Sequence, residues 1–256
     1  MTKTSMPDVQ PRTDADEAQI IANGHLLLTL YDNYSVSAPA PVEDWETVPR
    51  ACFARVRYST GVILGMDAHP TERIPLARSV YEHSVTFAWL LIDPERHYRR
   101  FLRWEINERT KMFDALAKHG SIAPPPKEVI ELALVGASDN AAPEMYDRAV
   151  AADKFWQAQP ERWRWHFVAS YGNVFRYLSS YVHPTLMGLD CFIARTPTGP
   201  FVLPTPDPTR EADNAAVVAV TSLADALMVS AAKFGWPPQR EVLRAFTVGF
   251  VPEGIP

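Results

Sequence analysis

The sequence predicts an all-α protein, a bundle of seven to nine helices with one small β-hairpin near residues 190–204. Two observations carry this prediction. Apolar side chains recur at helical spacing through most of the chain, and segments typical of strands do not alternate with helical ones. A doubly wound parallel sheet is therefore not expected.

Bulk composition limits the class of protein. The chain is 47% hydrophobic and 21% charged, as in ordinary globular proteins, and its net charge of −5 argues against a nucleic-acid coat protein. Residues 1–15 are polar and expected to be disordered, whereas residues 16–250 are expected to form a single helical domain. No apolar signal segment is visible near the first residue, so we expect a cytoplasmic protein.

The first half of the chain predicts four helices. Apolar spacing places one within residues 16–34 and another at 48–65, after which residues 65–75 are expected to turn the chain. Residues 76–92 are apolar almost all round, which is typical of a central helix. The Asp-Pro-Glu run at 93–95 is a strong helix start, and that helix is expected to end near Lys118, before Gly120.

The second half adds further helices and the hairpin. A short helix is expected within residues 127–136, another at 144–157, and a longer one at about 163–182, ended by Pro184. The hairpin would turn at Thr-Pro-Thr-Gly, residues 196–199.

A long apolar helix is expected at about 210–234, followed by a last helix from Pro237 to near Gly249. Asp225 lies at the centre of the apolar helix, where a bilayer would make a carboxylate costly. We therefore interpret this segment as a buried helix and expect no membrane partner.

Known catalytic and cofactor motifs are missing from the sequence. The chain has no P-loop, nucleophile-elbow or dinucleotide-binding glycine pattern, and its histidines have no metal-ligand spacing. Its two cysteines, Cys52 and Cys191, are expected to be buried free thiols. We expect no metal and no cofactor.

Two polar stripes are the candidate site. Arg78 and Glu82 are four residues apart on the apolar helix, so they can form an ion pair. The second stripe follows a 3, 4, 3 spacing and comprises Asn173, Arg176, Ser180 and His183, with Ser179 beside it. If the stripes face each other, they form an Arg-Glu-Ser-His cluster between two central helices.

Three interpretations of this cluster stay open: a structural lock between helices, a catalytic site, and a small-ligand pocket lined by Trp89, Trp104 and Tyr177. A separate basic stripe could contact phosphates or could be a solvated surface, and it comprises Arg96, Arg99, Arg100 and Arg103.

The segments LARSVYEHSVTFAWLLIDPERHYRRF and YGNVFRYLSSYVHP, together with the residues between them, resemble a bacterial family catalogued as domain of unknown function 5677. The resemblance covers about residues 20–235 and implies an all-helical fold. Matching positions are Arg78, Glu82, Ser179, His183 and Pro184. The family name implies no activity.

The chain is also similar to HEPN domains, helical bundles of which many are metal-independent ribonucleases. Their signature is an arginine, four to six residues, and a histidine on one helix; Arg176 and His183 fit, although Tyr177 stands where a polar residue is usual. The similarity implies a homodimer that cleaves RNA, with His183 as general acid or base and Arg176 stabilising the transition state.

In that interpretation Glu82 and Arg78 complete the cluster, Ser180 or Asn173 orients the phosphate, and the basic stripe holds the RNA backbone. No DNA partner is expected. The alternative is a non-enzymatic interaction or regulatory protein, of defence or toxin–antitoxin type, whose cluster is structural and sealed.

Overall fold

The computed structural model describes residues 14–35, 43–66, 70–120, 126–135, 137–159, 163, 165, 167–172, 193–197, 199–202 and 214–247. The helices described are α1 (Asp14–Ser35), α2 (Asp44–Gly65), α3 (Pro70–Leu90), α4 (Pro94–Lys118), α5 (Lys127–Ala133), α6 (Met145–Gln157), α7 (Phe167–Ser170), α10 (Asn214–Phe234) and α11 (Gln239–Thr247). The predicted all-α class is confirmed.

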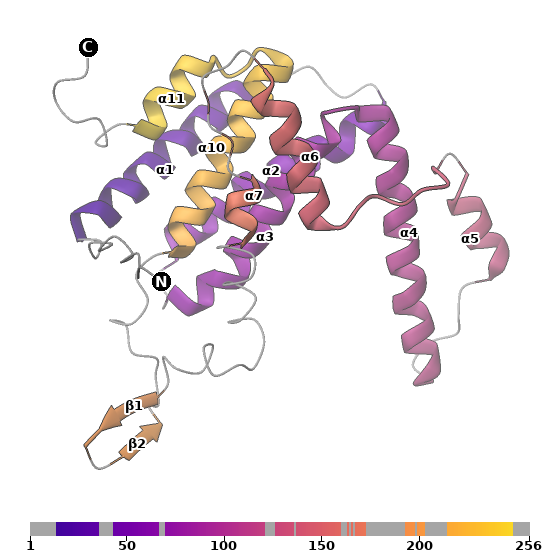
Figure 1. Cartoon of the computed structure of the whole chain (residues 1–256), viewed down its shortest axis with the longest axis horizontal. Coiled ribbons are helices and arrows are strands. Elements are labelled where there is room, and N and C mark those ends of the chain that lie inside the picture. Colours follow the sequence, from indigo (N-terminus) through magenta and orange to yellow (C-terminus); the bar gives the residue numbers. More distant parts are fainter. Residues whose placement is uncertain are drawn as a thin grey trace, which may run out of the picture.

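The predicted hairpin is also present. Strands β1 (Ile193–Thr196) and β2 (Gly199–Val202) pair in antiparallel register, with Ile193 opposite Val202 and Thr196 opposite Gly199. Figure 1 shows the pair standing apart from the helices.

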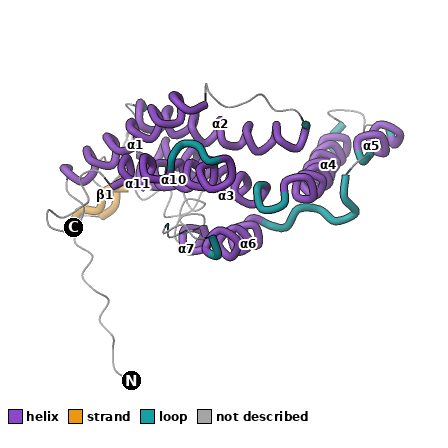
Figure 2. Tube along the Cα trace, turned by 90° about the horizontal axis from the view of Figure 1, so that it is seen from above, coloured by secondary structure: helices purple, strands orange, loops and turns teal. Residues whose placement is uncertain are grey.

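The core is built around α10. This helix packs against α1, α2, α3 and α11, and in the view from above α2 lies on one side of α3 and α10 while α6 and α7 lie on the other (Figure 2). Leu223 and Leu227 are fully buried along α10. The hydroxyl of Ser84 on α3 donates to the Ser222 carbonyl at 2.9 Å, which satisfies both polar groups inside this apolar contact.

Among the described residues, α10 is the one helix long and apolar enough to cross a membrane, with a mean hydropathy of 1.8 over Ala215–Phe234. However, 78% of that window is buried inside the protein. Packing against the other helices therefore accounts for its apolar character.

The predicted corner between the central helix and α4 is confirmed. Pro94 occupies the first turn of α4, and the His97 amide donates to the Asp93 carbonyl at 2.8 Å. The His97 ring stacks flat on Trp89, with centroids 4.2 Å apart, and its Nδ1 lies 2.7 Å from the Trp89 carbonyl oxygen. At the other end, Gly120 adopts a φ of 69° just past the helix, as expected for a C-terminal glycine.

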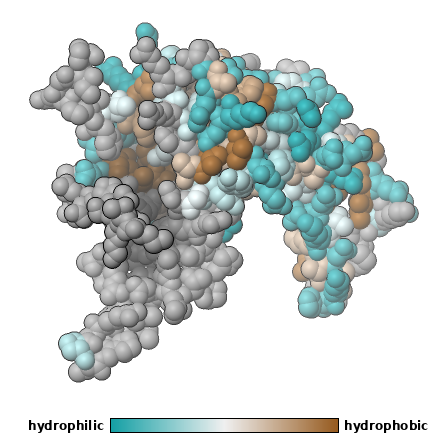
Figure 3. Space-filling model, viewed as in Figure 1, coloured by the Kyte–Doolittle hydropathy of each residue, from teal (hydrophilic) through white to brown (hydrophobic). Residues whose placement is uncertain are grey.

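Helices α4 and α5 form an arm. Figures 1 and 2 show the C-terminal half of α4 leaving the helical body, with α5 beside it. Figure 3 shows apolar surface on α5. The exposed apolar side chains of the arm are those of Met112, Leu116, Val129 and Val135.

Two helix starts differ from the prediction. Helix α2 begins at Asp44, not 48, because the Glu43 amide donates to the Glu46 carboxylate at 3.4 Å and caps an earlier turn. Helix α3 begins at Pro70, so the predicted turn over 65–75 is largely wrong. Pro49 and Pro75 lie inside these helices, close enough to the N-termini that each removes few hydrogen bonds.

The helix predicted at about 163–182 also begins later. Trp163 and Trp165 are not helical, and α7 starts at Phe167. Its first amides are held from outside the helix: Asp153 on α6 accepts from Phe167 N at 3.1 Å and from Val168 N at 2.8 Å. Residues 173–182 lie outside the described part of the chain.

Candidate functional site

The ion pair predicted on the central helix is present. Arg78 Nε lies 2.9 Å from Glu82 Oε1, one turn apart on α3. The two side chains are 25% and 32% exposed. The pair therefore lies at the surface of the helical body and is reachable from solvent.

The second polar stripe lies outside the described residues. This applies to Asn173, Arg176, Ser179, Ser180 and His183. The structure does describe the segment that leads into them: Tyr81 on α3 is buried, and its hydroxyl donates to the Phe167 carbonyl oxygen at 2.6 Å. This hydrogen bond fixes the start of α7 against α3 at Tyr81, the residue that precedes Glu82.

A buried acid lies close to this junction. Asp225 on α10 is 3% exposed, and its Oδ1 accepts a hydrogen bond from Trp163 Nε1 at 2.7 Å. The pKa of Asp225 is raised to about 7, mainly by burial; the hydrogen bond from the Trp163 indole opposes this rise, and the charge of Asp153 adds to it. Burial raises the pKa of Tyr81, and the negative charges of Asp153 and Asp225 raise it further.

A cavity of about 260 Å³ opens beside Glu82, between α2, α3, α4 and α6. Polar and aromatic groups in its walls include Glu82, His83, Thr86, Trp104, Glu105 and Arg148. Arg148 was not predicted from the sequence as a site residue. Its signal was present: Arg148, Ala152 and Trp156 recur every four residues on α6 and are all buried.

Arg148 is the most unusual group of this cavity. The residue is 2% exposed, and its guanidinium carbon lies 4.7 Å from the Trp104 ring centroid and 5.4 Å from that of Trp89. Burial lowers the pKa of Arg148 to about 10, so the side chain is still a cation at neutral pH.

His83 supplies an acid–base group to the same walls. Its Nδ1 lies 2.7 Å from the Ser79 carbonyl oxygen, which can only accept, so Nδ1 carries the proton. The neutral ring then has its lone pair on Nε2.

The structure describes two of the three aromatic residues predicted to line a ligand pocket. Trp104 lines the cavity, Trp89 is buried against Arg148, and Tyr177 lies outside the described residues.

The basic stripe has mixed roles on α4. Arg99 pairs with Glu95 at 2.6 Å, and Arg100 Nε donates to the Ala141 carbonyl at 3.2 Å, so both have protein partners. Arg96 is exposed and Arg103 is half-buried. Acidic side chains, among them Asp93 and Asp139, share the surface depression that Arg96 and Arg99 line.

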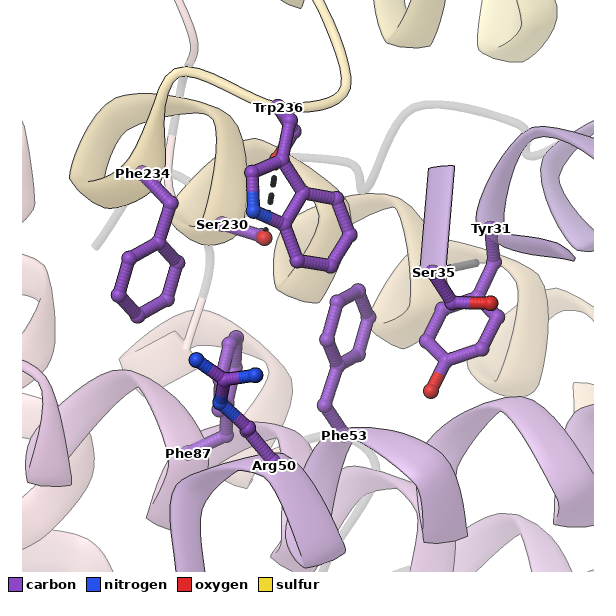
Figure 4. Close-up of a pocket in the computed structure, with 8 residues that line it drawn as sticks. All are labelled: Tyr31, Ser35, Arg50, Phe53, Phe87, Ser230, Phe234 and Trp236. Carbon is purple, nitrogen blue, oxygen red and sulfur yellow. Dashed lines mark hydrogen bonds between the residues drawn. The ribbon is translucent and has the colours of Figure 1, made fainter. Parts of the chain in front are cut away.

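A second cavity, also of about 260 Å³, lies at the end of α10. Figure 4 shows it lined mainly by aromatic rings, with Arg50 the one cation among the residues drawn. Phe53 and Phe87 stack at 4.8 Å, and the Ser230 hydroxyl donates to the Trp236 carbonyl oxygen at 3.0 Å. Such walls suit an apolar ligand and provide no acid–base pair.

Among the described residues, no group of three or more His, Cys, Asp or Glu side chains is placed to hold a metal ion. Cys52 is a buried free thiol, as predicted, while Cys191 lies outside the described part of the chain. Burial raises the pKa of Cys52 to about 12, so the thiol is protonated and unreactive at neutral pH.

Comparison with known proteins gives one match. Residues 56–199 match a family of unknown function, DUF5677. No curated protein matches the chain. No solved structure matches it either.

Proposed function

Because the chain belongs to the DUF5677 family, which has no assigned activity, we propose from its own residues that it is a metal-independent ribonuclease of HEPN type. The supporting observation is the hydrogen bond from Tyr81 to Phe167, 2.6 Å long, which fixes the start of α7 against α3 next to Glu82.

The proposed reaction needs only protein groups. His183 accepts the proton of a ribose 2′-hydroxyl, whose oxygen attacks the adjacent phosphorus. Arg176 stabilises the negative charge that gathers on the phosphoryl oxygens. The bond to the 5′-oxygen breaks, a protonated histidine donates to that oxygen, and the products are a 2′,3′-cyclic phosphate and a 5′-hydroxyl.

Accessibility favours catalysis over a sealed structural lock. A lock would bury Arg78 and Glu82 with every polar atom satisfied by its neighbours. Instead both side chains are partly exposed, and Glu82 lines a cavity. A substrate could reach this surface without the helices separating.

The remaining roles follow from the same proposal. Glu82, with Arg78, would orient the catalytic histidine or arginine, while Ser180, Ser179 or Asn173 would contact the phosphate. The RNA backbone would be contacted by Arg96 and Arg103. No hydrogen bond or ion pair is described above for these two members of the basic stripe. The protein would act in the cytoplasm as a homodimer.

The experiment is RNA cleavage in excess EDTA by the purified full chain. We expect His183→Ala and Arg176→Ala to lower the cleavage rate by about 100-fold or more, as loss of acid–base or electrostatic catalysis does. His119→Ala, at an exposed position after α4, should cleave like the wild type. Equal activity of wild type and His183→Ala would remove the proposal.

A non-enzymatic interaction role, of defence or toxin–antitoxin type, is the second candidate. The observation that favours it is the apolar surface of the α4–α5 arm, where Leu116 is 38% and Val135 is 75% exposed (Figure 3). Charges on this stretch of α4 pair within the helix, Glu105 with Arg109 and Glu108 with Lys111. These two pairs add no net charge to the arm, and a second copy of this chain is the partner we propose.

The oligomeric state tests that candidate. Light scattering of the wild type should give a dimer mass, and the double variant Leu116→Glu with Val135→Glu should give a monomer mass. A monomeric wild type, or a double variant that stays dimeric, would contradict pairing through the arm.

A further inference from the structure

The cavity beside Glu82 contains a buried cation, Arg148, that has hydrogen bonds but no ion-pair partner among the described residues. Glu82 and Glu105 both line it, but each has its own arginine, Arg78 at 2.9 Å and Arg109 at 2.6 Å. Arg148 has no carboxylate within ion-pair distance among the described residues. A buried charge without a partner is costly, so the cavity favours an anion that would supply one.

The hydrogen bonds of Arg148 leave part of its guanidinium available. Nε donates to the Pro143 carbonyl at 2.8 Å and Nη1 donates to Thr86 Oγ1 at 3.2 Å, which fixes the plane of the group. Within the described part of the chain, Nη2 donates to no acceptor. Arg148 lines the cavity, so Nη2 is the guanidinium nitrogen left to bind a ligand there. A fixed guanidinium with a free edge suits an oxyanion.

Part of the cavity wall is apolar. Phe101 and Trp104 line the cavity with ring centroids 5.5 Å apart, and Met145 lies in the opposite helix, α6. The volume of about 260 Å³ is just below the usual range for ligand sites, which suits a small ligand. A cavity of this size can hold a ligand made of one ring and one charged group.

We propose that this cavity binds a small oxyanion carried on a flat apolar group. The phosphate or carboxylate oxygens accept hydrogen bonds from Arg148, and the apolar group lies against Phe101, Trp104 and Met145. The proposal goes beyond RNA cleavage and does not depend on it, because none of the residues that hold the ligand belongs to the Arg176 and His183 pair.

Titration calorimetry on the full chain tests it with three probes: phenyl phosphate, benzoate and inorganic phosphate. We expect saturable binding of at least one ring-bearing probe, with a Kd at or below about 1 mM. A preference for phenyl phosphate identifies a phosphate ligand, and a preference for benzoate identifies a carboxylate. Inorganic phosphate should bind more weakly than phenyl phosphate. Equal binding of the two would overturn the claim that an apolar group of the ligand packs against the cavity wall.

Variants connect the binding to the cavity. Arg148→Gln should weaken binding by at least about thirtyfold, since it removes one partner of a buried charge pair. Arg244→Gln removes the same charge at an exposed position on α11 and should bind like the wild type. Met145→Trp leaves Arg148 in place but fills the cavity, and it should abolish binding even if Arg148→Gln fails to fold.

The proposal is overturned if no probe binds saturably to the wild type. It is equally overturned if Met145→Trp binds like the wild type. His183→Ala should bind the probes normally, which separates a failure here from a failure of the proposed ribonuclease.

Discussion

At the scale of single residues, Asp225 links the stability of the fold to pH. The residue is 3% exposed, and its Oδ1 accepts a hydrogen bond from Trp163 Nε1 at 2.7 Å. Burial raises its pKa to about 7 from a usual value of 3.8, so the folded chain binds this proton more tightly than the unfolded chain. The stability this gives is complete below about pH 4 and is lost as the pH rises through 7.

The variant Asp225→Asn should remove this dependence. The amide cannot ionise, and its oxygen can still accept from Trp163. A shift of about three pKa units corresponds to about 4 kcal/mol as an upper bound, so the variant should be more stable than the wild type at pH 8 and similar to it at pH 4.5. Thermal unfolding across this range measures the difference.

Asp147→Asn is the matched control, because Asp147 is exposed on α6. Its pH profile of stability should follow that of the wild type. If Asp225→Asn gives the same pH profile as this control, the carboxyl group is not the source of the dependence.

At the scale of elements, the start of α7 depends on a cap from another helix. Both oxygens of Asp153 accept backbone amides, those of Phe167 and Val168. Asp153→Ala should cost about 1–2 kcal/mol in urea unfolding, as the loss of an N-terminal cap does. Hydrogen exchange should accelerate at Phe167–Ser170.

Asp114→Ala, at an exposed position on α4, should leave both quantities unchanged. If the proposed ribonuclease depends on α7 for position, Asp153→Ala should also slow RNA cleavage. Unchanged exchange at Phe167–Ser170 would contradict the capping role.

Local signals explain which elements could be predicted from the sequence. Helix α4 was predicted from Asp93 to Lys118 because its start and its terminal glycine are marked by neighbouring residues. The α2 and α3 starts were missed because Pro49 and Pro75 suggested a helix start and a turn, yet both lie inside helices. The segment at Trp163 was predicted as helix, but its indole binds Asp225, 62 residues away.

Of the candidate site, only contacts between residues close in the sequence could be predicted. Arg78 and Glu82 are one helical turn apart, so their contact follows from spacing. The surroundings of Arg148 come from Thr86, Trp104 and Pro143, which lie on different segments. No sequence period brings those residues together, so the cavity required the structure.

At the scale of the whole molecule, the packing of α1 against α2 and α10 depends on Gly24. A Cβ atom at this position would lie 2.5 Å from Leu64 Cδ1 and 2.8 Å from Val220 Cγ2. Gly24→Ala should therefore destabilise the protein by about 1–3 kcal/mol through overpacking, although alanine is the better helix former.

Gly61 provides the opposite case on α2. Its nearest contacts to an added Cβ are at 3.8 Å, an ordinary van der Waals separation. Gly61→Ala should stabilise the protein by up to about 1 kcal/mol. Chemical unfolding measures the change in the free energy of unfolding for both variants. If Gly24→Ala proved stabilising, the packing described for α1 would be contradicted.

The proposed ribonuclease activity is tested most directly by the chemistry of its product. Wild-type protein in EDTA should cut an RNA oligonucleotide to a 2′,3′-cyclic phosphate, identified by mass spectrometry, and should leave the matched 2′-deoxy oligonucleotide intact. Cleavage of the deoxy substrate, products with any other phosphate end, or no cleavage at all would contradict the account.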